Sequence, residues 1–215
     1  MFDDRMDAAR RLAGRLSALK GQRPLVLAIP RGAVPMAAHI ARALDGELDV
    51  VLVRKLGAPG NPEYAIGAVD ESGTVWINPE VAARIDSSDL EHEVARQRSV
   101  LDTRRRTYGP ARDPAGRVVI VVDDGVATGS TLIAALRAVR RHQPRRLIAA
   151  IGVAPPETIA RLSGYADEIV CLDTPQWFGS VGEFYRDFAQ VEDTEVVRLL
   201  DEWRTGGTGS ARSQG

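Results

Sequence analysis

Apolar runs alternate with amphipathic segments along most of this chain. Val118–Val122 places five β-branched apolar residues in succession, a pattern typical of a central strand buried on both faces of a parallel sheet. Further short apolar runs predict strands at residues 24–29, 48–53, 146–153 and 168–172. The pattern therefore predicts a sheet whose middle is covered on both sides.

Segments with apolar positions at helical spacing separate these strands. They predict helices at residues 3–20, 34–44, 130–142 and 194–204, and a further helix start at Pro155-Pro156. Because strands and helices alternate, the sequence predicts an α/β fold with a doubly wound, mainly parallel sheet flanked by helices. We expect residues 1–204 to form a single domain.

An insertion interrupts this alternation at about residues 56–116. Glycine and proline at residues 57–62 predict a loop, and the runs 65–69 and 74–77 predict a small β-hairpin. Residues 87–108 follow as a heavily charged helix with a thin apolar stripe. The insertion is therefore expected to form a long inserted loop with a helical arm.

The C-terminal part differs in character from the rest. Residues 173–188 concentrate aromatic side chains in a chain that has few, and with the closing helix they predict a small hood at about residues 173–204. Gly, Ser and Thr dominate residues 205–215, which are expected to be a disordered tail.

Charge and cysteine content narrow the class of protein. Lys plus Arg total 28 and Asp plus Glu total 29, so the chain has no overall positive charge that would attract nucleic acid. We therefore do not expect nucleic acid as a partner. The single cysteine, Cys171, lies in an apolar run and fits a reducing compartment. The charged N-terminus lacks a signal-peptide core, and no run approaches the roughly 20 apolar residues of a membrane span. We expect a cytoplasmic protein without membrane contact.

The strand at residues 118–122 leads into the segment with the clearest chemistry. Asp123 and Asp124 end the strand, and the small-residue turn Thr128–Thr131 then carries hydroxyls and backbone N–H groups to the start of a helix. Such a helix start is an anion site. A carboxylate pair beside a phosphate cradle indicates a ligand with sugar hydroxyls and phosphate, and a divalent cation nearby.

This segment resembles the 5-phosphoribosyl-1-diphosphate motif of the type I phosphoribosyltransferases. Asp123–Thr131 fits the motif at nearly every position, and Gly125, where the family usually carries a larger residue, is a mild departure. It is not a P-loop, and the chain contains no Gly-x-Gly-x-x-Gly fingerprint. Most of residues 1–200 also resembles a less defined bacterial group of this family, beginning with Phe2-Asp3-Asp4-Arg5.

The resemblance implies a Mg2+-dependent enzyme that transfers a phosphoribosyl group from 5-phosphoribosyl-1-diphosphate to a nucleobase or similar acceptor. Asp123 and Asp124 would bind the ribose 2- and 3-hydroxyls and hold Mg2+, directly or through water. The ribose 5-phosphate would be bound by Ala127, Thr128, Gly129, Ser130 and Thr131. We also expect a homo-oligomer, namely a dimer.

The resemblance also assigns the diphosphate site to two other segments. The turn Pro30, Arg31 and Gly32 stands where relatives receive the diphosphate, and it predicts a cis peptide bond between Pro30 and Arg31. Arg54 and Lys55 stand where some relatives carry a basic pair that contacts diphosphate. Arg31 and Lys55 would then stabilise the leaving group as its charge develops, together with Asp123-Asp124-bound Mg2+.

The acceptor stays open. Relatives that act on 6-oxopurines carry a third acid in the phosphate loop, and Ala127 at that position indicates an adenine-type loop instead. The aromatic hood nevertheless resembles that of the 6-oxopurine enzymes, where a ring such as Trp177 or Phe178 would stack on the base. A packed cap over the sheet explains these aromatic residues equally well.

Two other functions compete with this interpretation. The first is a non-catalytic regulator that senses the activated sugar and binds nucleic acid through Arg104–Arg106. Because acidic residues are interspersed among the arginines of this helix, a solvent-exposed helix face also explains them. The second is an unrelated phosphate-binding α/β hydrolase.

Overall fold

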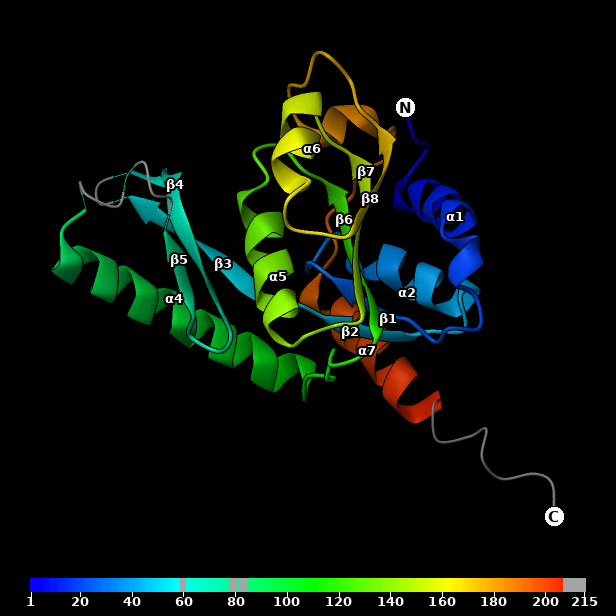
Figure 1. Cartoon of the computed structure of the whole chain (residues 1–215), viewed down its shortest axis with the longest axis horizontal. Helices are drawn as coiled ribbons and strands as arrows, with labels where there is room; N and C mark the ends of the chain where they lie inside the picture. The colour runs from blue at the N-terminus through cyan, green and yellow to red at the C-terminus, as the bar shows by residue number, and fades with distance from the viewer. Residues whose placement is uncertain (59–60, 78–80, 82–84, 207–215) are drawn as a thin grey trace.

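Five parallel strands form the central sheet of the protein (Figure 1). The structure is a computed structural model that describes residues 1–58, 61–77, 81 and 85–206. The strands stand in the order β2-β1-β6-β7-β8. They are β1 (Leu25–Ala28), β2 (Glu47–Val50), β6 (Val118–Gly125), β7 (Arg146–Val153) and β8 (Glu168–Asp173).

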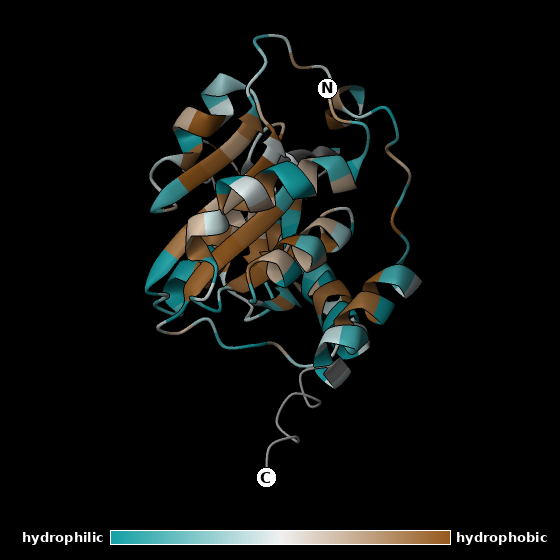
Figure 2. Ribbon diagram, turned by 90° about the vertical axis from the view of Figure 1, so that its right-hand side faces the viewer, coloured by the Kyte–Doolittle hydropathy of each residue, from teal (hydrophilic) through white to brown (hydrophobic). Residues whose placement is uncertain are grey.

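Helices cover both faces of this sheet. One face carries α1 (Arg5–Arg15), α2 (Val34–Ala43) and α7 (Asp193–Gly206), and the other carries α5 (Ser130–Arg141) and α6 (Pro156–Leu162). In Figure 2 the strands form a largely hydrophobic layer between helices that are hydrophilic on their outer sides. The predicted doubly wound α/β fold is therefore confirmed.

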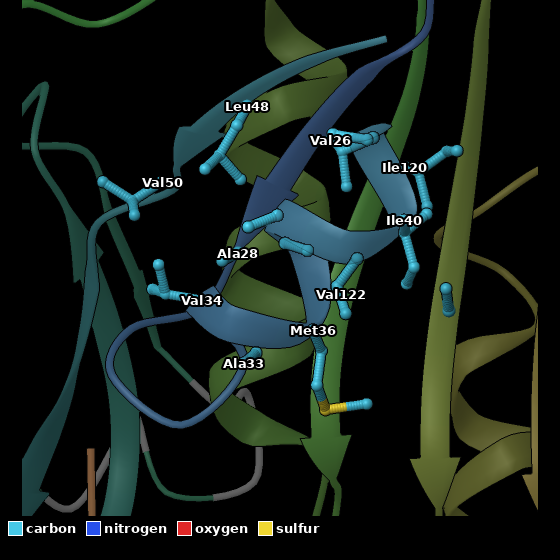
Figure 3. Packing of buried hydrophobic residues seen from close by; sticks show 14 of the residues in the cluster. Val26, Ala28, Ala33, Val34, Met36, Ile40, Leu48, Val50, Ile120 and Val122 are labelled. Carbon is cyan, nitrogen blue, oxygen red and sulfur yellow. The ribbon is translucent and has the colours of Figure 1, made fainter. Parts of the chain in front are cut away.

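The two faces are built from alternate residues of each strand. Val26 and Ala28 of β1 pack in the cluster beneath α2, whereas Leu25 and Leu27 pack in the cluster beneath α5. Figure 3 shows α2 laid across β1 and β6 in this core, with Met36 among the labelled side chains. A continuous apolar run is needed for such strands because neither face meets water.

The insertion forms a second, antiparallel sheet of order β3-β4-β5 beside a long helix. Its elements are β3 (Val53–Ala58), β4 (Asn61–Asp70), β5 (Val75–Ile77) and α4 (Ser87–Tyr108). We call these elements the arm; in Figure 1 they lie beside α5, away from β8. The predicted hairpin and charged helix are both confirmed.

The loop predicted at residues 57–62 is largely wrong. Gly57 and Ala58 continue β3 and pair with Ala65 and Asn61 of β4 across an irregular register, while residues 59 and 60 lie outside the described part. Cross-strand hydrogen bonds here outweigh the local preference of Gly and Pro for turns, as tertiary context often does.

Three element boundaries differ from the predictions. The first helix ends at Arg15 and continues only as a short 3-10 turn at Ser17–Leu19, and β2 ends at Val50 because Val53 already begins β3. Helix α7 extends through Gly206, beyond the predicted start of the tail, and residues 207–215 lie outside the described part. A second 3-10 turn, Val181–Phe184, lies in the hood.

The strand order creates a point where neighbouring connections diverge. From β1 the chain passes to β2 on one side, and from β6 it passes to β7 on the other, although β1 and β6 are paired neighbours. The turns that follow β1 and β6 therefore share one edge of the sheet, at the kind of position where parallel α/β sheets bind ligands. No helix in the described ranges is long and apolar enough to cross a membrane.

Candidate active site

The acid pair lies at the end of β6, and its two members have different partners. Asp124 Oδ2 accepts a hydrogen bond from Arg5 Nε at 2.7 Å, whereas Asp123 Oδ1 accepts a long one, 3.4 Å, from the backbone N of Gly125. Burial raises the pKa of Asp123 well above its ordinary value, and the neighbouring Asp124 charge raises it further. The two carboxylates thus differ: Asp124 is paired with Arg5, and Asp123 lies partly buried beside it.

The turn after β1 is pressed against this pair. The predicted cis peptide bond between Pro30 and Arg31 is present in the structure. A Cβ atom added at Gly32 would lie 2.3 Å from Asp124 Oδ2, so any larger residue would displace the carboxylate. The first turn and the acid pair thus form one site, although Gly32 and Asp123 are 91 positions apart in the sequence.

The loop between β6 and α5 is held from its outer side by α6. Thr158 Oγ1 donates to the carbonyl of Ala127 at 2.5 Å, and Arg161 Nη2 donates to the carbonyl of Thr128 at 2.6 Å. Gly129 has a φ of +82°, a left-handed conformation that favours glycine, and no side chain caps α5. With its carbonyls engaged by α6, the loop leaves the N–H groups of the first turn of α5 for an anion.

Hydroxyl groups accompany these N–H groups. Thr128 Oγ1 and Ser130 Oγ lie 3.4 Å apart at the mouth of the loop, and the side chains of Thr128 and Ser130 are at least partly accessible to water. Thr131 follows in the first turn of α5 and is also partly accessible. The segment can therefore offer both main-chain and side-chain donors to one phosphate group.

The hood contacts the acid pair from the opposite side. A Cβ atom at Gly125 would lie 2.3 Å from Val181 Cγ1, which explains why a larger residue is absent at this position. Tyr185 Oη donates to the Asp124 carbonyl at 2.5 Å, and burial, followed by the Asp124 charge, raises the Tyr185 pKa. The hood thus packs directly on the end of β6.

The sequence matches one protein family over most of its length. The model of the phosphoribosyl transferase domain matches residues 2–189, most of the chain and all of the site described so far. The chain belongs to the phosphoribosyl transferase domain family.

Individual relatives agree with this family assignment. Proteins from two strains of Mycobacterium tuberculosis, CDC 1551 and H37Rv, are 43% identical over 206 residues and are provisionally named phosphoribosyl transferases. The match covers 94% of this chain and 46% of either relative, so the chain spans about half the length of these curated relatives. The crystal structure of TT1426 from Thermus thermophilus is 49% identical, covers 94% of this chain and 99% of its own, and superposes with a TM-score of 0.83.

In the structure, the two arginines predicted to bind diphosphate contact other protein groups. Arg31 Nη1 lies 3.7 Å from Glu192 and 3.6 Å from Asp193, at the start of α7. Arg54 Nε donates to Gln97 of α4 at 2.8 Å, and its pKa is lowered by burial and by neighbouring arginines. Lys55 follows on β3 with an exposed side chain. Arg31 is thus held by acids at the start of α7, and Arg54 is held within the arm.

The predicted base-stacking residues differ in accessibility. Trp177 is 92% exposed, while Phe178 is stacked on Phe184 with ring centroids 5.3 Å apart and planes inclined by 23°. One face of Phe178 is therefore used within the hood, and Trp177 projects into solvent.

The sequence reading missed several residues around the site. Arg5 appeared only as part of the N-terminal resemblance, and no local pattern connected Tyr185, Thr158 or Arg161 with the acid pair or the loop. Of the arginines proposed to bind nucleic acid, Arg105 forms an ion pair within the protein, because its Nε lies 2.5 Å from Glu71. The regulator hypothesis therefore loses its central residue.

Proposed function

We propose that the protein is a Mg2+-dependent phosphoribosyltransferase that uses 5-phosphoribosyl-1-diphosphate as donor and a nucleobase-like acceptor, giving a nucleotide and diphosphate. The observation that supports this most is the convergence of the acid pair, the Gly32 turn and the uncapped start of α5 at the divergence point of the sheet. A donor of this kind carries a phosphate, two ring hydroxyls and a diphosphate, one group for each part of the site.

Each part then has a defined role. Ala127–Thr131 bind the 5-phosphate through N–H groups and hydroxyls at the positive end of α5. Asp123 and Asp124 accept hydrogen bonds from the ribose 2- and 3-hydroxyls. Pro30–Gly32 and Lys55 bind the diphosphate, and Arg31 exchanges Glu192 and Asp193 for it, because a charged phosphate competes well for a guanidinium.

The acid pair fits Mg2+ only in partnership with the donor. The described residues contain no group of three or more His, Cys, Asp or Glu side chains that could hold a metal ion. Mg2+ is commonly bound by one or two carboxylates together with substrate phosphates and water, which matches Asp123 and Asp124. When bound, the ion supplies positive charge that stabilises the diphosphate as it leaves the ribose.

The acceptor approaches from the side of the site that the hood borders. The reaction needs a base nitrogen to approach ribose C1 while diphosphate departs, so the acceptor must lie on the side that the diphosphate does not occupy. Phe178 and the exposed Trp177 offer ring surfaces for stacking on a planar base. Ala127 supplies no acid to the acceptor, so its specificity depends on the hood.

Donor binding tests the assignment of the acid pair. Asp123→Asn and Asp124→Asn should each weaken binding of 5-phosphoribosyl-1-diphosphate with Mg2+ by about ten- to a hundredfold, since hydrogen bonds to a charged group contribute about 1.5–3 kcal/mol. Isothermal titration calorimetry measures the affinity. Asp45→Asn is the matched control, because Asp45 is exposed and precedes β2, at the opposite edge of the sheet.

Turnover tests the reaction. A panel of nucleobases incubated with the donor and Mg2+ should release diphosphate with at least one acceptor. Donor affinities of the Asn variants equal to that of the wild type would contradict the assigned roles. Tight donor binding without turnover on any base would leave a donor-binding protein and contradict the transferase.

A further inference from the structure

Arg5 lies inside the site although it belongs to the first turn of α1. Its side chain is 12% exposed and that of its partner Asp124 is 14% exposed, so the ion pair is largely removed from water. Arg5 reaches this place because Phe2 pairs with the hood: Phe2 N donates to the Phe184 carbonyl at 2.7 Å, and Arg186 N donates to the Phe2 carbonyl at 2.9 Å. The N-terminal segment is therefore part of the site wall.

Three parts of the Arg5 guanidinium are held by separate partners. Nε donates to Asp124 Oδ2 at 2.7 Å, and Nη1 donates to the Ala189 carbonyl at 2.6 Å. The plane of the group lies over the Phe188 ring, 3.7 Å from its centroid. These contacts fix both the position and the orientation of the charge.

The remaining nitrogen, Nη2, faces the turn after β1. It lies 3.2 Å from the place where a Cβ atom of Gly32 would be, and within the described ranges no hydrogen bond engages it. Each Nη of arginine carries two N–H donors. A fixed cation with unused donors thus points at the turn that would receive the diphosphate.

We propose that Arg5 is a binding residue of the donor site, which holds Asp124 in place and offers Nη2 to the diphosphate at Pro30–Gly32. The inference rests on the proposed function, and it extends the site to α1 and the hood. The absence of a side chain at Gly32 allows the turn to lie close to both groups, because a Cβ atom there would contact Asp124 Oδ2 and Arg5 Nη2. Arg5 then binds the diphosphate while Arg31 is still paired with α7.

Two fragments of the donor separate this role from a purely structural ion pair. Calorimetry with inorganic diphosphate plus Mg2+, and separately with ribose 5-phosphate, should be carried out on the wild type, Arg5→Gln and Arg5→Lys. Arg5→Gln should weaken diphosphate binding at least about tenfold, because a charge-assisted hydrogen bond is lost. Ribose 5-phosphate should lose about threefold or less, because its phosphate is held by the start of α5 and Asp123 still binds its hydroxyls when Asp124 loses Arg5.

Arg5→Lys and a second arginine supply the controls. Arg5→Lys keeps the charge and should recover most of the diphosphate affinity, although it lacks the planar fork and should unfold at a lower temperature than the wild type. Arg10→Gln removes a charge from the exposed side of the same helix and should change neither affinity.

The outcomes separate the two proposals. If the wild type binds both fragments and Arg5→Gln either binds diphosphate as the wild type does or loses the two ligands equally, the Arg5 inference is overturned and the proposed function stands. If the wild type binds neither fragment, both are overturned.

Discussion

Gly152 is the position at which a single methyl group should disturb both the sheet and the acid pair. It is buried in β7, beside the end of β6. A Cβ atom there would lie 2.3 Å from the Asp124 carbonyl oxygen and 2.3 Å from Tyr185 Oη. These two oxygens form the 2.5 Å hydrogen bond that joins the hood to β6. Gly152→Ala must therefore separate this pair or push the strands apart.

The expected loss of stability follows from these contacts. Breaking a buried hydrogen bond and leaving its groups unsatisfied costs about 1–3 kcal/mol, and overpacking a buried site costs about 1–3 kcal/mol more. Gly152→Ala should thus lower the free energy of unfolding by about 2–6 kcal/mol, a large share of the roughly 5–15 kcal/mol of a typical domain. Urea unfolding followed by tryptophan fluorescence measures this loss.

A double-mutant cycle tests the stated cause. Tyr185→Phe removes one of the two atoms that the methyl group meets, so Gly152→Ala should cost at least about 1 kcal/mol less in that background. Gly164→Ala is the matched control, since nothing lies within 4 Å of its Cβ position, and it should change stability by less than about 0.5 kcal/mol. Additive effects of Gly152→Ala and Tyr185→Phe would refute the reasoning.

Two further predictions concern titrating groups. Burial, with the hydrogen bond and charge of Asp193, raises the pKa of Tyr108 from its ordinary 10 to about 12. Between pH 10 and 12 the folded protein then keeps a proton that the unfolded chain releases, so the contribution of Tyr108 to the free energy of unfolding should be constant below pH 10 and fall between pH 10 and 12. Tyr108→Phe should remove part of this fall. If urea titrations show the same dependence of the free energy of unfolding on pH for Tyr108→Phe and the wild type, the assignment is contradicted. Burial raises the pKa of Cys171 to about 11, so iodoacetamide at pH 8 should label the folded protein roughly a hundredfold more slowly than the urea-unfolded chain, and equal rates would show an accessible thiolate.

Arg31 is paired with Glu192 and Asp193 in the structure. Asp193 also accepts a hydrogen bond from Tyr108 at the end of α4, so one acid of α7 contacts both the turn after β1 and the arm. Donor binding that draws Arg31 away would change the partners of Asp193. Asp193 therefore connects the arm with the turn after β1 through a single carboxylate.

The sequence by itself determined the class of fold and contains a contiguous motif that resembles the phosphate-binding segment of the family. The apolar run Val118–Val122 predicts a strand buried on both faces because periodicity is a local property, and Asp123-Asp124 with the loop to Thr131 is a contiguous segment whose chemistry can be read without neighbours. The cis bond at Pro30-Arg31 was predicted from the resemblance to the family, whose members often carry such a bond in the turn after the first strand, and it is present in the structure. The arm was predicted in part. Its strands were predicted to be too short, because Gly and Pro locally favour turns.

Only the tertiary structure decided which distant groups complete the site. Strand order places the Gly32 turn against Asp124, and Arg5 meets Asp124 across 119 residues of sequence. Tyr185 reaches the same residue from the hood, and Arg31 is drawn toward α7. Such contacts leave no periodic or motif signal, because they arise when separate elements pack on a shared core and the resulting geometry brings their side chains together.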